Sequence, residues 1–204
     1  AAQAPLARVR SAGVLDTAAF PIWEGGAEPS DVRRLLEAPA PGALATDSWE
    51  GLWRVVYAPH IRGLGSVALT RFDVYYDILP ASREGGLEMR SFVRFEGPLW
   101  RGWLNAAGVV REVPAEGPGE VEVAFSEFWL DWGRASPRTA PDAPADAALQ
   151  ALARPFFVRE LSRFPVLFFE PGAEATVFRF PPLGVEIAAR RVGPSGTPVR
   201  QLRA

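Results

Sequence analysis

Hydrophobic and polar residues alternate with a period of two over most of the chain after residue 48. In residues 87–95, for example, Leu87, Met89 and Val93 share one face, while the other face is charged around a single phenylalanine, Phe92. This alternation is typical of strands with one buried and one wet face. The pattern predicts strands at 52–58, 72–79, 87–95, 99–105, 109–113, 120–130, 163–169, 175–180 and 184–192.

Glycine and proline fall between these segments and predict short connections. Gly63 and Gly65, residues 80–86, residues 106–108 and residues 114–119 all read as turns or loops. Strands joined by short turns favour an antiparallel meander. Because free edge strands promote aggregation, closure of the sheet into a barrel is the economical arrangement. We therefore expect an all-β fold, an eight- to nine-stranded antiparallel barrel with an N-terminal arm and short helices.

The ends of the chain and one internal segment differ from this pattern. Residues 1–47 form an arm that we expect to pack across one end of the barrel, with a short helix over residues 30–37. The barrel domain is expected over residues 48–193. It is interrupted at 134–155 by a Pro-rich surface loop and a short helix over 146–153. Residues 194–204 are polar and predict a frayed tail.

The alternation shifts within the segment 120–130. Val121, Val123 and Phe125 lie on one face, but after Ser126 the apolar positions fall out of step. One extra residue in a strand produces this change of face, so a β-bulge is predicted at Ser126.

The predicted interior is rich in aromatic side chains. An eight-stranded barrel has a lumen just wide enough either to be filled by side chains or to hold one small ligand. Both interpretations stay open at this point. The candidate interior and ligand-binding residues are Trp53, Tyr57, Phe72, Tyr76, Phe95, Trp100, Phe125 and Phe128.

The amino-acid composition argues against several classes of function. The net charge of −2 argues against a general nucleic-acid binder, because phosphate binding needs a basic surplus. The absence of cysteine excludes thiol catalysis, and the absence of lysine excludes Schiff-base chemistry. No apolar run approaches the roughly 18 residues that cross a bilayer. The chain starts with small residues and without methionine, as after removal of a targeting peptide.

Catalytic and metal-binding constellations are not evident. His60 is the single histidine, and neither Ser48 nor Ser66 lies in a nucleophile-elbow motif that would combine with His60 and Asp73. One histidine cannot build a histidine-rich metal site. We expect no catalytic residue and no metal site.

The start of the first predicted strand carries a recognisable motif. Gly51-Leu52-Trp53 resembles the Gly-x-Trp motif of lipocalins. The longer stretch 49–57 resembles the opening of the plastid lipid-associated protein (fibrillin) domain, and the resemblance spans roughly residues 47–191. It implies a lipocalin-like barrel in which Trp53 packs at the closed end. There an arginine of the last strand, Arg190 or Arg191, covers its ring, and only one of these neighbours points inward.

Two more expectations concern the same stretch. Gly51 is expected to let the chain cross beneath Trp53. Trp49, four residues before Trp53, is expected to be a lid or an outer-face aromatic residue.

The resemblance also implies a function. Fibrillin-like proteins associate with a hydrophobic small molecule (a lipid, quinone or carotenoid) in the chloroplast, soluble or peripheral, at thylakoids or plastoglobules. The expected partners are that molecule and the thylakoid membrane surface or photosynthetic complex subunits, with no nucleic acid and no other cofactor.

Two other functions stay open from the residues. The first is a non-catalytic scaffold or assembly subunit of a photosynthetic membrane complex. Aromatic residues outside the barrel, with Trp23, Trp103 and Trp132 as candidates, would favour it. The second is an isomerase-type activity that uses Asp73, Asp77 or Glu127, which would require a buried carboxylate beside a real cavity.

Overall fold

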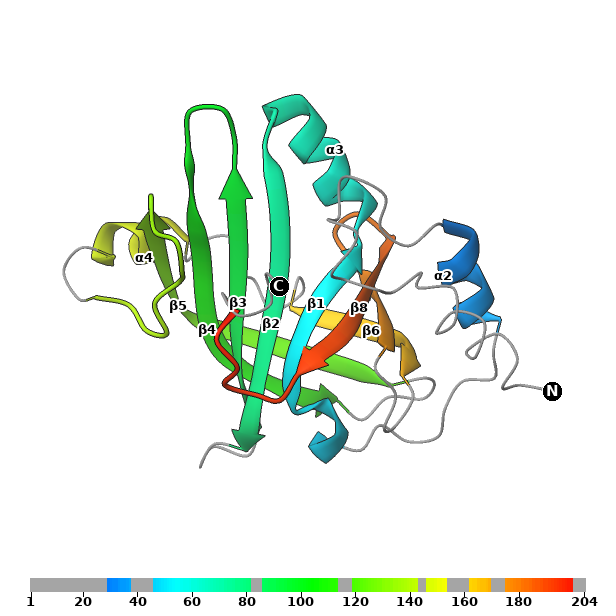
Figure 1. Cartoon of the computed structure of the whole chain (residues 1–204). Coiled ribbons are helices and arrows are strands. Elements are labelled where there is room, and N and C mark those ends of the chain that lie inside the picture. The colour runs from blue at the N-terminus through cyan, green and yellow to red at the C-terminus, as the bar shows by residue number, and fades with distance from the viewer. Residues whose placement is uncertain are drawn as a thin grey trace.

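Eight antiparallel strands pair in chain order and close into one barrel, with β8 against β1 (Figure 1). The structure is a computed structural model that describes residues 29–37, 46–81, 86–113, 119–142, 146–153, 162–169 and 175–199. The strands are β1 Gly51–Tyr57, β2 Arg71–Ala81, β3 Leu87–Glu96, β4 Arg101–Val113, β5 Glu120–Trp132, β6 Arg163–Phe169, β7 Ala175–Phe180 and β8 Val185–Gly193. The all-β antiparallel barrel expected from the sequence is confirmed.

Short helices lie at the ends and on the outside of this barrel. They are α2 Pro29–Leu36, the 3₁₀ helix η1 Thr46–Trp49, α3 Pro59–Ala68 and α4 Ala147–Ala153. Helix α2 buries Val32 and Leu35 against Phe168 and Val177 on the outer face of the barrel. This part of the arm therefore packs on the side of the barrel and not across one end. Residues 1–28 and 38–45 of the arm lie outside the described residues.

Strand β4 corrects the predicted turn at residues 106–108. Those residues continue a single strand of 13 residues, so the two strands predicted at 99–105 and 109–113 are one. A Cβ at Gly108 would lie 2.1 Å from the carbonyl oxygen of Ala124 on β5. Glycine is needed here because the two backbones approach closely, not because the chain turns.

The close approach coincides with the predicted bulge. The β4–β5 register shifts between Ala107 and Gly108, which pair with Glu127 and Phe125 and leave Ser126 as the extra residue. The β-bulge predicted at Ser126 is confirmed.

Helix α3 occupies the segment where Gly63 and Gly65 predicted a turn. Pro59 lies in its first turn and Leu69, in a left-handed conformation, ends it. Gly65 is buried, and a Cβ there would lie 2.6 Å from the carbonyl oxygen of Thr70. The glycine therefore lets the chain fold back tightly from α3 into β2.

The segment after β8 is packed rather than frayed as far as residue 199. Val199 is buried, and the amide of Gly196 donates to Asp77 Oδ1 at 2.9 Å. The segment covers the outer face of the sheet, where Phe92, predicted amid charged neighbours, is also buried. The residues of this outer cluster are Leu52, Tyr75, Phe92, Trp103, Trp129 and Val199.

The loop after β5 is exposed but anchored. Asp131 is fully buried and accepts hydrogen bonds from Asn105 Nδ2 at 2.9 Å and from Arg138 Nε at 2.5 Å. Arg138 also pairs with Asp146 at 3.1 Å. These charge-assisted contacts tie the Pro-rich loop to the outer face of β4 and β5.

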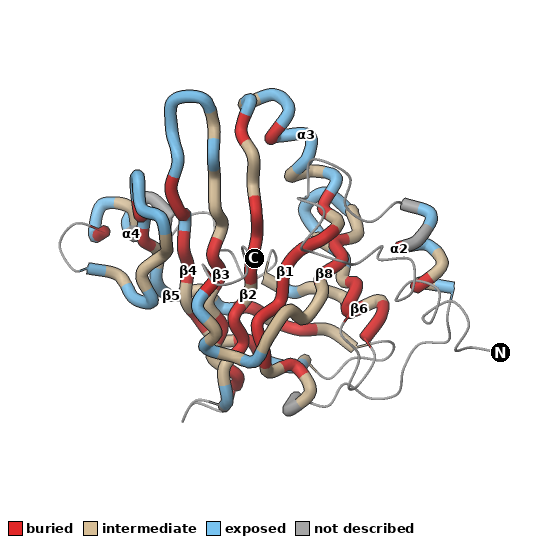
Figure 2. The backbone as a smooth tube through the Cα atoms, viewed as in Figure 1, coloured by how far each residue is buried: buried red, intermediate tan, exposed pale blue. Residues whose placement is uncertain are grey.

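Exposure follows this arrangement along the barrel (Figure 2). The strands are mostly buried through their middle and lower parts, whereas α3 and the tip of the β3–β4 hairpin are largely exposed. We call this exposed end the upper end, and the opposite end, where η1 meets β1, the floor.

We predict that Gly108→Ala lowers the free energy of unfolding by about 1–3 kcal/mol, because the added methyl group meets backbone on β5. The matched control is Gly63→Ala on α3, where an added Cβ meets nothing within 4 Å. This control should gain up to about 1 kcal/mol from helix propensity. Urea unfolding followed by circular dichroism measures both, and equal stability of the two variants would contradict the close approach at Gly108.

Candidate ligand site inside the barrel

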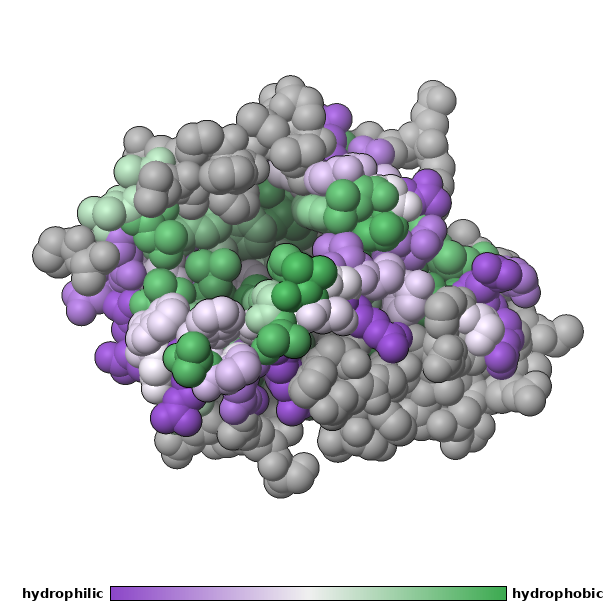
Figure 3. Space-filling model, turned by 90° about the horizontal axis from the view of Figure 1, so that it is seen from above, coloured by the Kyte–Doolittle hydropathy of each residue, from purple (hydrophilic) through white to green (hydrophobic). Residues whose placement is uncertain are grey.

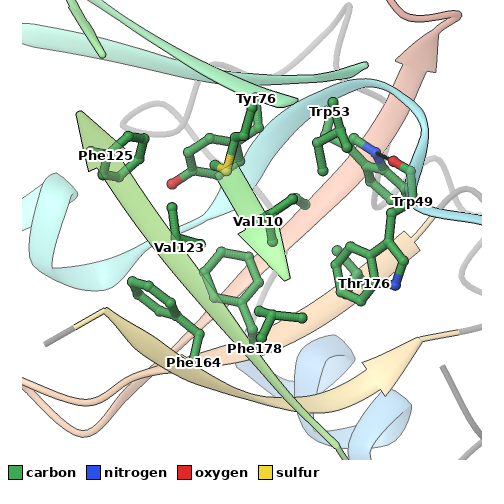
Figure 4. Close-up of a pocket in the computed structure, with 13 residues that line it drawn as sticks. Trp49, Trp53, Tyr76, Val110, Val123, Phe125, Phe164, Thr176 and Phe178 are labelled. Carbon is green, nitrogen blue, oxygen red and sulfur yellow. Dashed lines mark hydrogen bonds between the residues drawn. The ribbon is translucent and has the colours of Figure 1, made fainter. Parts of the chain in front are cut away.

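An apolar cavity of about 90 Å³ lies inside the barrel (Figure 4). One water molecule needs about 10–15 Å³ of such space, so the cavity exceeds a packing defect. Its walls come from all eight strands and from η1, so the whole barrel shapes it. The lining residues are Trp49, Trp53, Tyr76, Ile78, Met89, Val110, Val121, Val123, Phe125, Phe164, Thr176, Phe178 and Ala189.

Three of the eight predicted interior residues line this cavity, namely Trp53, Tyr76 and Phe125. Phe72, Phe95 and Phe128 lie on the same inner face by register, nearer the upper end. The ring of Phe128 lies 6.0 Å from that of Phe125. These three belong to the upper barrel and do not line the cavity itself.

The interior positions expected for Tyr57 and Trp100 are wrong. The β1–β8 register shifts between Val55 and Tyr57, which turns Tyr57 to the outer cluster under α2. Trp100 lies in the β3–β4 turn, 40% exposed, and its indole N–H donates to Thr70 Oγ1 at 2.9 Å. A bulge and a turn therefore break the alternation from which both positions were inferred.

Trp49 corrects a further expectation, because it is neither a lid nor an outer residue. It is buried, lines the cavity and stacks on Phe169 with ring centroids 4.5 Å apart. Trp49 precedes β1, so alternation could not show which way its ring points. Phe164 on β6 and Phe178 on β7 were also missed, because both strands carry apolar residues on their inner and outer faces, so their sequences do not separate inside from outside.

The floor joins the first strand to the last. Arg191 lies over the ring of Trp53, with its guanidinium carbon 4.8 Å from the centroid, and it donates to the carbonyl oxygen of Ser48. The predicted cation–π contact is confirmed with Arg191. Arg190 lies opposite Arg54, on the outer side of the strand pair.

Two backbone features hold this floor in place. The indole N–H of Trp53 donates to the carbonyl oxygen of Trp49 at 2.9 Å, drawn as a dashed line in Figure 4. Gly51 has φ +137°, and a Cβ there would lie 3.1 Å from Arg191 Cδ. A glycine is therefore required where the chain passes beneath Trp53.

The carboxylates considered for catalysis lie outside the barrel. Asp73 is buried in an outer ion cluster, 2.8 Å from Arg54 and 3.4 Å from Arg71. Asp77 accepts from Gly196, and burial raises the pKa of its carboxyl group. Glu127 is exposed. None of the described residues that line the cavity is a carboxylate.

His60 packs at the upper end. Its ring stacks on Phe180 with centroids 5.1 Å apart, and burial lowers the pKa of its imidazole. The Ser66 hydroxyl donates to the Arg62 carbonyl within α3. Neither His60 nor Ser66 is among the residues that line the cavity.

Exposed hydrophobic residues gather at the upper end, on α3 and on two turns. The Trp100–Thr70 hydrogen bond ties the β3–β4 turn to the end of α3, and the His60–Phe180 stack ties α3 to the end of β7. Figure 3, seen from this end, shows a hollow with hydrophobic residues on its walls and edge. We call the following residues the upper rim: Leu64, Val67, Leu69, Leu99, Trp100 and Leu183.

Metal-binding and membrane-spanning features were sought in the described part of the chain. There, His, Asp and Glu form no group of three or more that could hold a metal ion. None of the described helices has the length and apolar character needed to cross a membrane.

Comparisons with protein-family models, curated proteins and solved structures found no match to this chain. The resemblance of residues 49–57 to the lipocalin and fibrillin motif therefore stays a prediction from the sequence. The barrel and its cavity are the features of the molecule that bear on its function.

We predict that Arg191→Met lowers the free energy of unfolding by about 1–3 kcal/mol. The variant keeps the aliphatic contact but loses the cation–π contact and the charged hydrogen bond to Ser48. Arg111→Met on the exposed face of β4 is the matched control and should change stability little. Urea unfolding followed by tryptophan fluorescence measures both, and equal losses would contradict the role of Arg191 in the floor.

Proposed function

We propose that this protein binds a hydrophobic small molecule inside its barrel. The observation that carries the proposal is the apolar cavity, lined by all eight strands. Its lining is almost wholly aliphatic and aromatic, so a ligand gains affinity by leaving water rather than by ionic contacts. The walls are strand residues, so the site is formed before the ligand arrives and little ordering is needed on binding.

The two ends of the barrel support one direction of access. Trp49, Trp53 and Arg191 close the floor. The upper end is hollowed in Figure 3, and its inner face continues the apolar wall through Phe128 and Phe95. A ligand would enter from the upper end and rest above Trp53. Because the cavity measures about 90 Å³ and a cavity of roughly 150 Å³ takes up benzene, a larger ligand would extend from it into the hollow of the upper end.

The finer identity of the ligand comes from the motif in residues 49–57. That resemblance supports a lipid, quinone or carotenoid as ligand and a chloroplast location at thylakoids or plastoglobules. The alternative role, as a scaffold subunit, would be favoured by aromatic residues on the outside of the barrel. Trp132 is 63% exposed but lies on the inner face by register, with its ring 5.8 Å from that of Phe95. Trp103 is covered in the outer cluster, and Trp23 lies outside the described residues. The interior aromatic residues therefore favour ligand binding over the scaffold role.

A second candidate function is contact with a lipid surface through the upper rim. Its side chains are strongly exposed, with Leu99 at 89% and Val67 at 86%. Exposed apolar residues on neighbouring loops are typical of interaction sites. Arg62 and Arg101, both exposed, flank them and would attract anionic headgroups. Since the rim surrounds the hollow end, such contact would bring the cavity mouth to a lipid reservoir.

The cavity is tested with two neighbouring residues of β4. Val110 lines the cavity, whereas Val109 lies on the opposite face. We expect Val110→Phe to fill the cavity and weaken binding of the uncharged fluorescent probe N-phenyl-1-naphthylamine at least about tenfold, or about 1.4 kcal/mol. Val109→Phe should leave the affinity unchanged.

Probe titration is combined with organic extraction and mass spectrometry of the purified protein. A co-purifying lipid, quinone or pigment supports the proposal and identifies the ligand. If no such molecule co-purifies and the probe does not bind, or if both variants bind it equally, the site is not this cavity.

The rim is tested by co-sedimentation with vesicles of phosphatidylcholine and phosphatidylglycerol. We expect Val67→Asp combined with Leu99→Asp to weaken vesicle binding at least about tenfold, because two apolar side chains are lost from the contact. Ala135→Asp with Ala140→Asp on the exposed loop after β5 is the charge-matched control. Equal loss in both pairs would show a general charge effect, and no binding by the unmodified protein would contradict the lipid contact.

A further inference from the structure

The hydroxyl group of Tyr76 faces the cavity, and none of the residues that the structure describes bonds to it. Tyr76 lies on β2, lines the cavity and packs its ring edge-on against Phe178 at 6.4 Å. Figure 4 shows its oxygen directed among the lining side chains, on the side of Phe125 and Val123. No hydrogen bond joins this hydroxyl to another of the described residues, and the Tyr76 side chain is only partly buried.

The other hydroxyl group of the lining is already used inside the protein. Thr176 Oγ1 donates to the carbonyl oxygen of Phe168 at 3.0 Å. The remaining lining residues are hydrocarbon, apart from the thioether of Met89 and the indoles of Trp49 and Trp53. The Trp53 indole N–H is bound to the carbonyl of Trp49. Of the two hydroxyl groups in the described lining, that of Tyr76 is therefore the one that is not already used within the protein.

The protonation state of this hydroxyl decides which ligand atoms it can bind. Burial raises the pKa of Tyr76 to about 12, so the phenol is neutral near pH 7 and carries a proton to donate. The residue is only partly buried, so the hydroxyl borders open space in the cavity, where a ligand atom can accept its proton. An acceptor that reaches it gains one hydrogen bond.

The charge of the lining narrows the choice of acceptor. None of the described lining residues is an arginine, a histidine or a lysine. Arg191, the nearest cation of the floor, lies over Trp53 and bonds to the Ser48 carbonyl. A ligand carboxylate would enter the cavity without a counter-charge, which is strongly unfavourable. An uncharged oxygen is the acceptor that fits.

We infer that the ligand is an apolar molecule with one uncharged carbonyl oxygen, such as a ketone, quinone or ester, and that Tyr76 donates a hydrogen bond to it. This inference rests on the proposed function and names the ligand class of that site. Tyr76 selects among apolar molecules, and the surrounding hydrocarbon walls supply most of the affinity.

The test compares two probes of nearly equal shape, 2-acetylnaphthalene and 2-ethylnaphthalene, by quenching of tryptophan fluorescence. We expect Tyr76→Phe to reduce the preference for the ketone over the hydrocarbon about five- to tenfold, the usual size of one hydrogen bond. The change in this ratio cancels the different water solubilities of the probes. Tyr57→Phe on the outer face is the matched control and should leave the ratio unchanged.

Stability and an anionic probe give two independent readouts. The unfolding midpoint of Tyr76→Phe should equal or exceed that of the unmodified protein, because the hydroxyl makes no hydrogen bond to the residues that the structure describes. A clear loss of stability would overturn the inference. The anion 2-naphthoate should bind at least about tenfold more weakly than the ketone, and tighter binding of the anion would also overturn the inference.

The outcomes distinguish a failure of the Tyr76 assignment from a failure of the proposed ligand binding. If both naphthalenes bind and the ratio is the same in Tyr76→Phe, the assignment of Tyr76 is wrong and the proposed cavity function stands. If neither naphthalene binds the unmodified protein, the proposed function itself is contradicted.

Discussion

The contact between Arg191 and the ring of Trp53 is the constraint on which the rest of this barrel depends. It joins β8 to β1, and Arg191 also bonds to the Ser48 carbonyl 143 residues earlier in the chain. Closure at this point turns a meander into a barrel, leaves the sheet without a free edge and covers one end of the lumen. Gly51 permits this contact, because its backbone has φ +137° and a Cβ there would lie 3.1 Å from Arg191 Cδ.

Two irregularities then decide which aromatic side chains face the lumen. The bulge at Ser126 keeps Phe125 and Phe128 on the inner face although they are an odd number of positions apart, with Ser126 and Glu127 between them. The register shift after Val55 has the opposite consequence and sends Tyr57 outward. Because a shift of one residue exchanges the two faces of a strand, each bulge changes the chemistry of the cavity as much as a substitution would.

Both faces of much of the sheet are covered, which separates structural aromatic residues from those at the site. Helix α2 covers one part of the outer face, and the segment that ends at Val199 covers another. Buried charges such as Asp73 and Asp131 are held there with arginine partners. The lumen keeps the apolar residues and one phenol, Tyr76, whose chemistry would select the ligand.

Local sequence pattern alone determined the strands and most of their faces, because period-two alternation is a property of neighbouring residues. Strands 163–169 and 175–180 match β6 and β7, and the bulge at Ser126 was also predictable. The resemblance to the Gly-x-Trp motif, not the alternation, implied an arginine over Trp53, either Arg190 or Arg191. Tertiary structure alone decided that β4 runs through Gly108, that Trp49 lines the floor, that residues 194–199 pack on the outer face, and that a cavity remains. Each depends on segments distant in sequence, such as Gly108 against Ala124 or Gly196 against Asp77. A volume left between eight strands cannot be read from any one of them.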